Sequence, residues 1–229
     1  MGCGLVAAVT SLGGRQLVPR EFLGRPATVV APLLLGCVLV HEVPEGLVAL
    51  ELTEVEAYTG STDPASHAFR GRTARNEVMF GEPGYAYVYF TYGMHFCVNL
   101  VCESVGEAAA VLLRAGRVVE GVELATKRRS AVPGRREAKL ASGPARLCQA
   151  LGIDRAQNGA DVCSPRGALR LYPGDEVDAD QVAIGPRVGV STGADVPWRY
   201  WISGDASVSP YRGHVPKRRT GPPITGSTG

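Results

Sequence analysis

The segment 47–58 constrains the fold most, because its apolar side chains recur at every second position. Such alternation is typical of a strand that buries one face. On a strand, six side chains would share that face: Val48, Leu50, Leu52, Glu54, Glu56 and Tyr58. An unpaired buried carboxylate is costly. We therefore expect the two acids to be either hydrogen-bonded structural groups or part of a pocket that carries out proton chemistry.

Further strands are predicted around this segment. Residues 37–43 should pair with 47–58 through a turn at 44–46, and residues 85–91 and 95–102 should form a second hairpin. Four more strands are expected at residues 108–114, 169–172, 187–190 and 200–203. Adjacent hairpins without a βαβ rhythm predict an α+β fold. We expect a single domain built on a curved, partly open, barrel-like antiparallel sheet with flanking helices.

Helices and a long loop are predicted between these strands. Pro26 should begin a helix over residues 27–35, a weaker helix is expected at 121–129, and Ser142 should cap a helix over 143–151. Residues 63–84 are rich in Gly, Pro and Arg and predict an extended loop. Loops of this length in a compact domain are commonly functional.

The length of 229 residues, of which 45% are hydrophobic, suits one core. We expect a flexible leader over residues 1–18, one globular domain over 19–212, and a disordered tail over 213–229. The leader lacks the basic start and cleavage site of a secretory signal. No run approaches the roughly 18 apolar residues of a membrane span. We therefore expect no membrane partner and a cytoplasmic protein.

Charge and cysteine content exclude little by themselves. The net charge is only +2, from 24 basic and 22 acidic residues. Basic side chains gather in the span 127–139, which predicts either a solvated helix face or a patch that contacts phosphates. Six cysteines occur without a Cys-x-x-Cys pair, so we expect no metal and no cofactor. Cys97, Cys102 and Cys148 lie among apolar residues and should be buried as reduced thiols.

Eight short motifs, taken together and in order, resemble the methylpurine (3-methyladenine, alkyladenine) DNA glycosylase family. They are Glu54-Val55-Glu56-Ala57-Tyr58, Asp63-Pro64-Ala65-Ser66-His67, Thr73-Ala74-Arg75-Asn76, Met79-Phe80, Tyr87-Val88-Tyr89, Tyr92-Gly93-Met94-His95, Val111-Leu112-Leu113-Arg114-Ala115 and Ser142-Gly143-Pro144. Several separated motifs are far more specific than any single one. The resemblance covers about residues 22–209.

The resemblance implies a DNA repair enzyme. Such an enzyme flips an alkylated or deaminated purine out of double-stranded DNA and hydrolyses its N-glycosidic bond, leaving an abasic site. A monomer without lyase activity is implied. No lysine lies near the motifs, which is consistent with a reaction that forms no Schiff base.

Site residues are assigned by this resemblance. Glu56 matches the general base that activates water, and Arg114 matches an arginine near that water. The base pocket would be formed by Tyr58, His67, Tyr89 and Asn99. The three rings would stack on the flipped purine, and Asn99 would clash with the exocyclic amine of unmodified guanine. For Glu54 we prefer a structural role.

DNA contacts are expected from the second hairpin and the long loop. Tyr92, at the predicted hairpin tip, would enter the duplex and fill the gap left by the flipped nucleotide. Arg70, Arg72 and Arg75 would contact phosphates. His95 is given no catalytic role.

Simpler and competing interpretations remain open. Tyr89 could simply pack against its neighbours in a strand, and Arg114 could form a buried ion pair with an acid such as Glu56. The whole protein could be a noncatalytic nucleic-acid-binding module of the same fold. It could also be a carbohydrate glycosidase that uses Glu54 and Glu56 as its acid pair. Against the last, Trp198 and Trp201, the only tryptophans, lie far from the acids in sequence.

Overall fold

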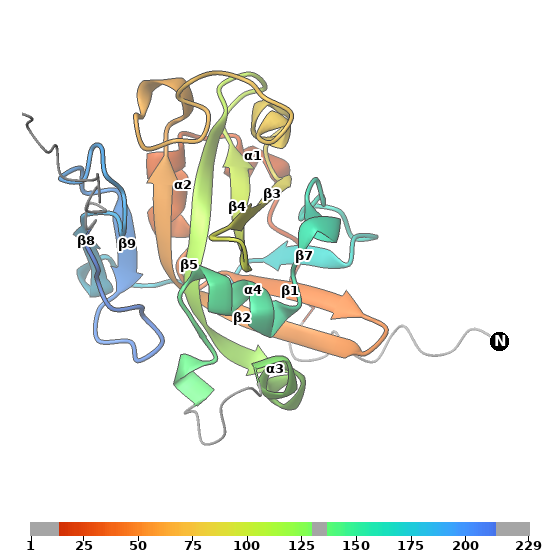
Figure 1. Cartoon of the computed structure of the whole chain (residues 1–229). Helices are drawn as coiled ribbons and strands as arrows, with labels where there is room; N and C mark the ends of the chain where they lie inside the picture. The colour runs from red at the N-terminus through yellow and green to blue at the C-terminus, as the bar shows by residue number, and fades with distance from the viewer. Residues whose placement is uncertain (1–13, 130–136, 214–229) are drawn as a thin grey trace, which may run out of the picture.

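The computed structural model describes residues 14–129 and 137–213 (Figure 1). Most of the predicted leader, nearly all of the predicted tail and the middle of the basic span 127–139 lie outside the described residues. The fold is α+β, as predicted. Within the described residues it is built on one nine-stranded antiparallel sheet that does not close into a barrel.

The central strands of the sheet are β2 and β5, which cross the molecule side by side (Figure 1). The main path runs β3-β4-β5-β2-β1-β7, while β6 pairs with β5, and β9 pairs with both β2 and β8. The strands are β1 Val38–Val43, β2 Gly46–Tyr58, β3 Ala86–Thr91, β4 His95–Cys102, β5 Ala109–Glu120, β6 Ala141–Ser142, β7 Leu169–Tyr172, β8 Val182–Gly185 and β9 Arg199–Ile202. Both predicted hairpins, β1–β2 and β3–β4, are therefore confirmed.

Short helices flank the sheet. The α-helices are α1 Arg20–Leu23, α2 Ala27–Leu33, α3 Val122–Arg129 and α4 Pro144–Leu151. Single 3₁₀ turns lie at Gly60–Thr62, Glu77–Phe80, Glu137–Lys139, Arg155–Gln157 and Ala179–Gln181. Helices α2 and α4 contribute their buried side chains to the same core as β2, β4 and β5. The three helices predicted from sequence are present with slightly shorter bounds.

Two local predictions were wrong. Ser142 does not cap α4, because it belongs to β6 and its hydroxyl donates to the carbonyl of Val208 at 3.5 Å. Gly143 occupies the cap position instead, with a φ of 104° that a β-carbon would disfavour. The strand expected at 187–190 is also absent. The strand in this part of the chain, β8, lies earlier, at Val182–Gly185.

The predicted six-residue face of β2 is interrupted. Leu50 and Leu52 lie in the main core, but beyond them the core residues are Val55 and Ala57, so the alternation changes phase. The pairing of β2 with β5 shifts register on both sides of Glu54, which is how β-bulges reverse the facing of a strand. The acids are therefore on the face opposite the apolar row, and the expectation that they share its face was wrong.

The two faces of the sheet consequently have different surroundings. The main core covers one face together with α2 and α4. On the other face, Tyr87, Val101 and Ala110 pack against Ala68 and Met79 from the long segment between β2 and β3. The predicted long loop thus forms a wall over the face that carries the acids.

Candidate active site

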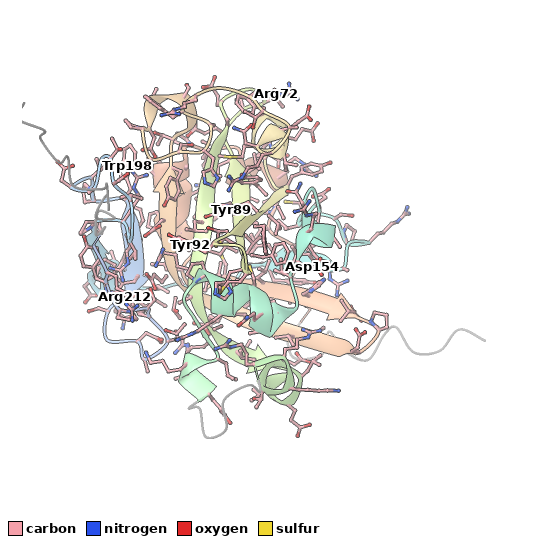
Figure 2. The ribbon with its side chains drawn as sticks, viewed as in Figure 1. Arg72, Tyr89, Tyr92, Asp154, Trp198 and Arg212 are labelled. Carbon is pink, nitrogen blue, oxygen red and sulfur yellow. The ribbon has the colours of Figure 1, made fainter. Side chains whose placement is uncertain are left out.

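A cavity of about 450 Å³ opens on the sheet face that carries the acids. Seven residues that the sequence singled out line it together: Glu56, Tyr58, His67, Tyr89, Tyr92, Asn99 and Arg114. They come from β2, β3, β4, β5 and the loops between them. Figure 2 shows Tyr89 and Tyr92 close together near the middle of the molecule. Residues far apart in sequence are therefore brought to one site.

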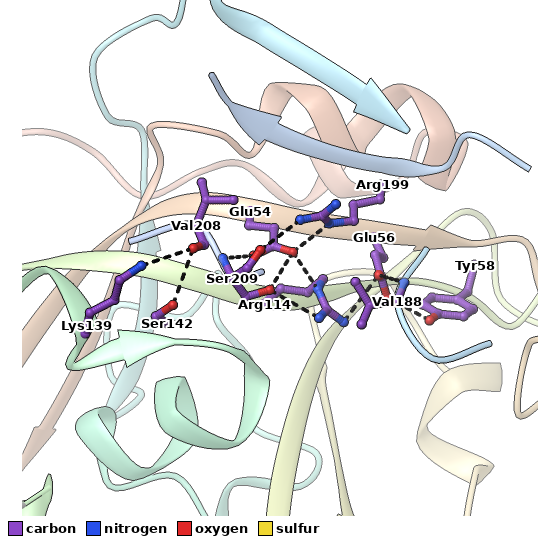
Figure 3. A network of polar contacts seen from close by, with 10 residues as sticks. All are labelled: Glu54, Glu56, Tyr58, Arg114, Lys139, Ser142, Val188, Arg199, Val208 and Ser209. Carbon is purple, nitrogen blue, oxygen red and sulfur yellow. Dashed lines mark hydrogen bonds and ion pairs between the residues drawn. The ribbon is translucent and has the colours of Figure 1, made fainter. Parts of the chain in front are cut away.

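Glu56 is the buried carboxylate of this cavity, held from three directions (Figure 3). Its Oε1 accepts the backbone N–H of Val188 at 2.7 Å and lies 3.2 Å from Arg114 Nη1. Its Oε2 accepts the hydroxyl of Tyr58 at 2.9 Å. These contacts fix the orientation of the carboxylate at the cavity wall.

Arg114 lies between two acids. Its Nε donates to Glu54 Oε1 at 2.8 Å, while its Nη1 faces Glu56. Burial by itself would lower the pKa of Arg114, but the charges of Glu56 and Glu54 outweigh it and raise the pKa. The guanidinium therefore remains charged, and the ion pair with Glu56 that the sequence left open is present.

Glu54 does not line the cavity and is fully buried beside it. Its carboxylate accepts from Arg114, from Arg199 Nε at 2.7 Å, and from the Ser209 hydroxyl at 2.9 Å and N–H at 2.7 Å. Burial would raise the pKa of Glu54, but Arg114, Arg199 and Ser209 together lower it. Glu54 is thus a buried anion whose hydrogen-bonding capacity is used within the protein.

Aromatic rings form another part of the cavity wall. The His67 ring meets Tyr89 edge-on with centroids 4.5 Å apart, and its Nδ1 lies 3.0 Å from the Tyr87 hydroxyl. Partial desolvation and the charge of Arg75 lower the pKa of His67. Burial raises the pKa of Tyr58 and of Tyr89 well above the ordinary value, so both phenols stay neutral. The cavity thus offers uncharged rings at neutral pH.

Asn99 is buried on β4, and its side-chain amide donates to the backbone carbonyl of Tyr87 at 3.1 Å. It therefore both bonds the backbone and lines the cavity. Tyr87 was not singled out from sequence, although alternation places it on the same face as Tyr89. Its ring stacks on Tyr89 with centroids 5.5 Å apart.

A buried ion pair that the sequence did not reveal supports the site. Arg187 binds the carboxylate of Asp63 through both terminal nitrogens at 2.5 and 2.9 Å, and stacks on Tyr58 with its central carbon 4.6 Å from the ring centroid. Its neighbour Val188 donates to Glu56. Because 124 positions separate Asp63 from Arg187, no local pattern could have identified this contact.

Tyr92 is at the tip of the β3–β4 hairpin and is 85% exposed. Its φ is 51° and that of Gly93 is 68°, while Met94, also exposed, donates its N–H to Thr91. The exposed ring also lines the mouth of the cavity. This geometry is compatible with the predicted insertion into a duplex.

The three loop arginines do not line the cavity. Arg70 is exposed, and Arg72, at the upper loop in Figure 2, pairs with Glu77 at 2.9 Å. Arg75 lies over the Tyr89 ring, 5.6 Å from its centroid. Arg75 therefore contacts a ring that lines the cavity, whereas Arg72 contacts Glu77 and Phe80, which do not.

The described part of the basic span has local structural contacts. Arg128 Nη1 donates to the carbonyls of Leu151 at 2.7 Å and Ala150 at 3.3 Å, and Arg129 Nε donates to Leu140 at 3.0 Å. Neither a solvated face nor a free phosphate patch describes these two side chains. Arg135 and Arg136 lie outside the described residues.

Among the described residues, no group of three or more His, Cys, Asp or Glu side chains is arranged to hold a metal ion. Cys97, Cys102 and Cys148 are buried free thiols, as predicted. None of the helices in the described ranges has the length and apolar character needed to cross a bilayer.

Comparison with known proteins identifies the family. Residues 21–206 match the model of the family described as "Methylpurine-DNA glycosylase (MPG)". A protein of Streptomyces avermitilis is 58% identical over 207 residues, covering 90% of this chain and 96% of its own. One of Leifsonia xyli is 56% identical over 191 residues, covering 81% and 88%. Both are named "Putative 3-methyladenine DNA glycosylase". This chain belongs to the methylpurine-DNA glycosylase family.

Proposed function

We propose that this protein is a DNA repair glycosylase that releases alkylated or deaminated purines from double-stranded DNA. The observation that carries the proposal is the cavity in which Glu56, held by Arg114 and Val188, faces the rings of Tyr58 and Tyr89. Its volume of about 450 Å³ lies within the range of roughly 300–1,000 Å³ typical of small-molecule sites.

Glu56 is the general base in this proposal. A purine methylated at N3 or N7 carries a positive charge and leaves readily. Water then attacks C1′ as the bond to the purine nitrogen breaks, the bonding electrons leave with the base, and Glu56 accepts the proton of the water. The same carboxylate stabilises the positive charge that develops on the sugar. General-base assistance is worth on the order of 10²–10⁴ in rate.

The aromatic residues select the base. Tyr58, His67 and Tyr89 stack on the flipped purine, and neutral rings attract a cationic base more strongly than a normal one. Stacking contributes about 1–3 kcal/mol per base. Asn99, at the cavity wall, excludes the exocyclic amine of unmodified guanine. The raised pKa values of Tyr58 and Tyr89 support this role, because they keep both rings uncharged.

The reaction ends at an abasic site without strand cleavage. A lyase needs an amine that forms a Schiff base with the sugar. In the part of the chain that the structure describes, no lysine lines the cavity, and Lys139 contacts the Val208 carbonyl at 3.5 Å. A monomer suffices for this reaction, because Glu56 and the aromatic rings all come from one chain.

Contacts with DNA are made outside the cavity. Tyr92 enters the duplex, and Arg70, Arg72 and Arg75 bind phosphates around the flipped nucleotide. The position of Tyr92 at both the hairpin tip and the cavity mouth supports this arrangement.

The carbohydrate glycosidase alternative is disfavoured by the same cavity. Its second acid, Glu54, does not line it, and neither Trp198 nor Trp201 does. Their rings instead stack under Arg187 and Arg199, with the guanidinium carbons 5.1 and 4.4 Å from the centroids.

The test is single-turnover release of hypoxanthine, 3-methyladenine and 7-methylguanine from defined duplexes, with denaturing gels to score strand cleavage. Glu56→Gln should lower release at least about 100-fold while the strand stays intact. The matched control is Glu51→Gln, on the same strand, whose carboxylate pairs with Arg117 outside the cavity. Lesion binding by the wild type without release from any substrate would contradict the proposal and favour the binding module.

A further inference from the structure

Glu54 is a fully buried anion that the proposed reaction does not use. Oε1 accepts from Arg114 Nε at 2.8 Å, Arg199 Nε at 2.7 Å and the Ser209 hydroxyl at 2.9 Å, and Oε2 accepts the Ser209 N–H at 2.7 Å (Figure 3). A carboxylate has about four acceptor positions. Because the side chain is fully buried and does not line the cavity, substrate cannot reach it, and any effect on the reaction must pass through its partners.

Arg114 is the partner that reaches the cavity. It donates to Glu54 at 2.8 Å through Nε and approaches Glu56 at 3.2 Å through Nη1. The shorter contact is with the acid outside the cavity. One guanidinium is therefore shared between two carboxylates, and the geometry of its fork is set by Glu54.

The charges around Arg114 balance. Glu54 and Glu56 supply two negative charges, and Arg114 and Arg199 supply two positive ones, all on buried side chains. Buried charges interact more strongly than exposed ones because water screens them little. A change of charge at Glu54 or Arg199 should therefore alter the electrostatic potential at Glu56.

From this network we infer that Glu54 is a positioning residue. It anchors Arg114 through Nε, so that Arg114 meets Glu56 through Nη1 alone and the Glu56 carboxylate stays oriented at the cavity wall. The inference rests on the proposed function. It extends that function by giving the buried acid and Arg199 a role in setting the charge that Glu56 meets.

Other groups that face Glu56 stay constant in the test. They are the hydroxyl of Tyr58, the Tyr89 ring, the Cys97 thiol, the Arg187 guanidinium and the Val188 N–H. None of them contacts Glu54 directly among the hydrogen bonds and ion pairs of the described residues. A substitution at Glu54 therefore changes the charge next to Arg114 Nε and leaves these five groups around Glu56 in place.

The first variant is Glu54→Gln, which keeps the size of the side chain. Without the Glu54 charge, Arg114 pairs with Glu56 alone and favours its ionised form. The acid limb of the pH dependence of base release should move to lower pH by about one unit. The plateau rate should fall about 10-fold, because a weaker base accepts a proton less readily. Glu51→Gln, the matched control, should leave both unchanged.

Arg199→Gln should shift the acid limb in the opposite direction. Without this cation, Glu54 attracts Arg114 more strongly and draws it away from Glu56. Protonation of Glu56 is then favoured. The acid limb should therefore move to higher pH by about one unit. Ser209→Ala removes a neutral hydroxyl, which donates to Glu54 at 2.9 Å and accepts from Arg114 Nη2 at 3.4 Å, and should move it the same way by less. This milder variant keeps the test possible if a charge substitution prevents folding.

A titration that needs no activity separates this inference from the proposed function. In protein labelled with ¹³C at glutamate carboxyl carbons, the Glu56 resonance is assigned by its absence in Glu56→Gln. Its titration midpoint should move down in Glu54→Gln and up in Arg199→Gln. If these midpoints shift as expected but the wild-type protein releases no base, the proposed function is contradicted and the positioning role is not. Unchanged midpoints in folded variants, or a rate loss without any shift of the acid limb, would overturn the positioning role.

Discussion

At the residue scale, Tyr92 combines an exposed aromatic ring with a backbone conformation that is uncommon for tyrosine. Its side chain is exposed, and its backbone has a φ of 51° next to a φ of 68° at Gly93. Positive φ at both central residues is what a type I′ hairpin turn requires, and Asn or Gly normally fills these positions. A tyrosine there is strained. Strain of this kind is consistent with a residue kept for function.

Tyr92→Asn should separate stability from activity. Asn tolerates the left-handed conformation, so the free energy of urea unfolding should stay the same or rise by up to about 1 kcal/mol. Release of hypoxanthine from a fully paired duplex should fall about 10-fold, because nothing fills the gap in the stack. The deficit should shrink when the lesion lies in a bubble of unpaired bases. An equal deficit in both contexts would argue against intercalation.

At the element scale, the C-terminus of α4 explains the position of Arg128 within the basic span. Arg128, on α3, donates to the carbonyls of Ala150 and Leu151 in the last turn of α4, and Gly152 follows in the left-handed conformation. Carbonyls at a helix end lack partners within the helix, and a cation there also complements the helix dipole. The sequence pattern revealed the charges, and the packing of α3 against α4 decided their use.

Arg128→Met should therefore cost stability and spare DNA binding. We expect a loss of about 1–2 kcal/mol in the free energy of unfolding, measured by urea denaturation. Affinity for a lesion duplex, measured by fluorescence anisotropy, should change less than about twofold. Arg70→Ala is the matched comparison and should show the reverse, with weaker binding and a shallower salt dependence. Loss of affinity in Arg128→Met without loss of stability would instead favour a phosphate patch.

Strands differed in how well the sequence predicted them. The hairpins β1–β2 and β3–β4 were predicted because alternation and short turns are local signals. The prediction of a strand at 187–190 was wrong. Arg187 is buried because it pairs with Asp63, and not because it belongs to a strand of the sheet. The phase change in β2 was missed as well. It depends on extra residues on both β2 and β5, and neither segment shows it alone.

At the scale of the whole molecule, His41 links the sheet to two helices. It is buried on β1, its Nδ1 lies 2.9 Å from the Leu151 carbonyl of α4, and Arg128 of α3 and Asp154 are nearby charges. Burial lowers the pKa of His41 below its ordinary 6.5. In the unfolded chain His41 gains a proton near pH 6.5, whereas in the folded protein it does so only at lower pH.

Global stability should consequently fall as the pH drops below about 6.5, because the unfolded state then binds more protons. One such histidine contributes at most about 1.4 kcal/mol per pH unit. Urea unfolding between pH 5 and 8 should show a smaller slope for His41→Gln than for the wild type. His67→Gln should also reduce the slope, because the pKa of His67 is lowered too, and the double variant should lose both contributions. The lowered pKa of Glu54 contributes only below its ordinary 4.5.

Local sequence patterns determined the α+β class and both hairpins, because side-chain alternation and short turns act over a few positions, whereas the residues that line the cavity were identified by the motif resemblance. The motif resemblance determined the family. Only the tertiary structure decided that the acids turn away from the apolar row, that Val188 holds Glu56, and that Arg114 is shared between two carboxylates. These contacts join residues 58 to 132 positions apart. These contacts stabilise the fold because each buried charged or polar group is paired with another. No short stretch of sequence can specify such a pairing.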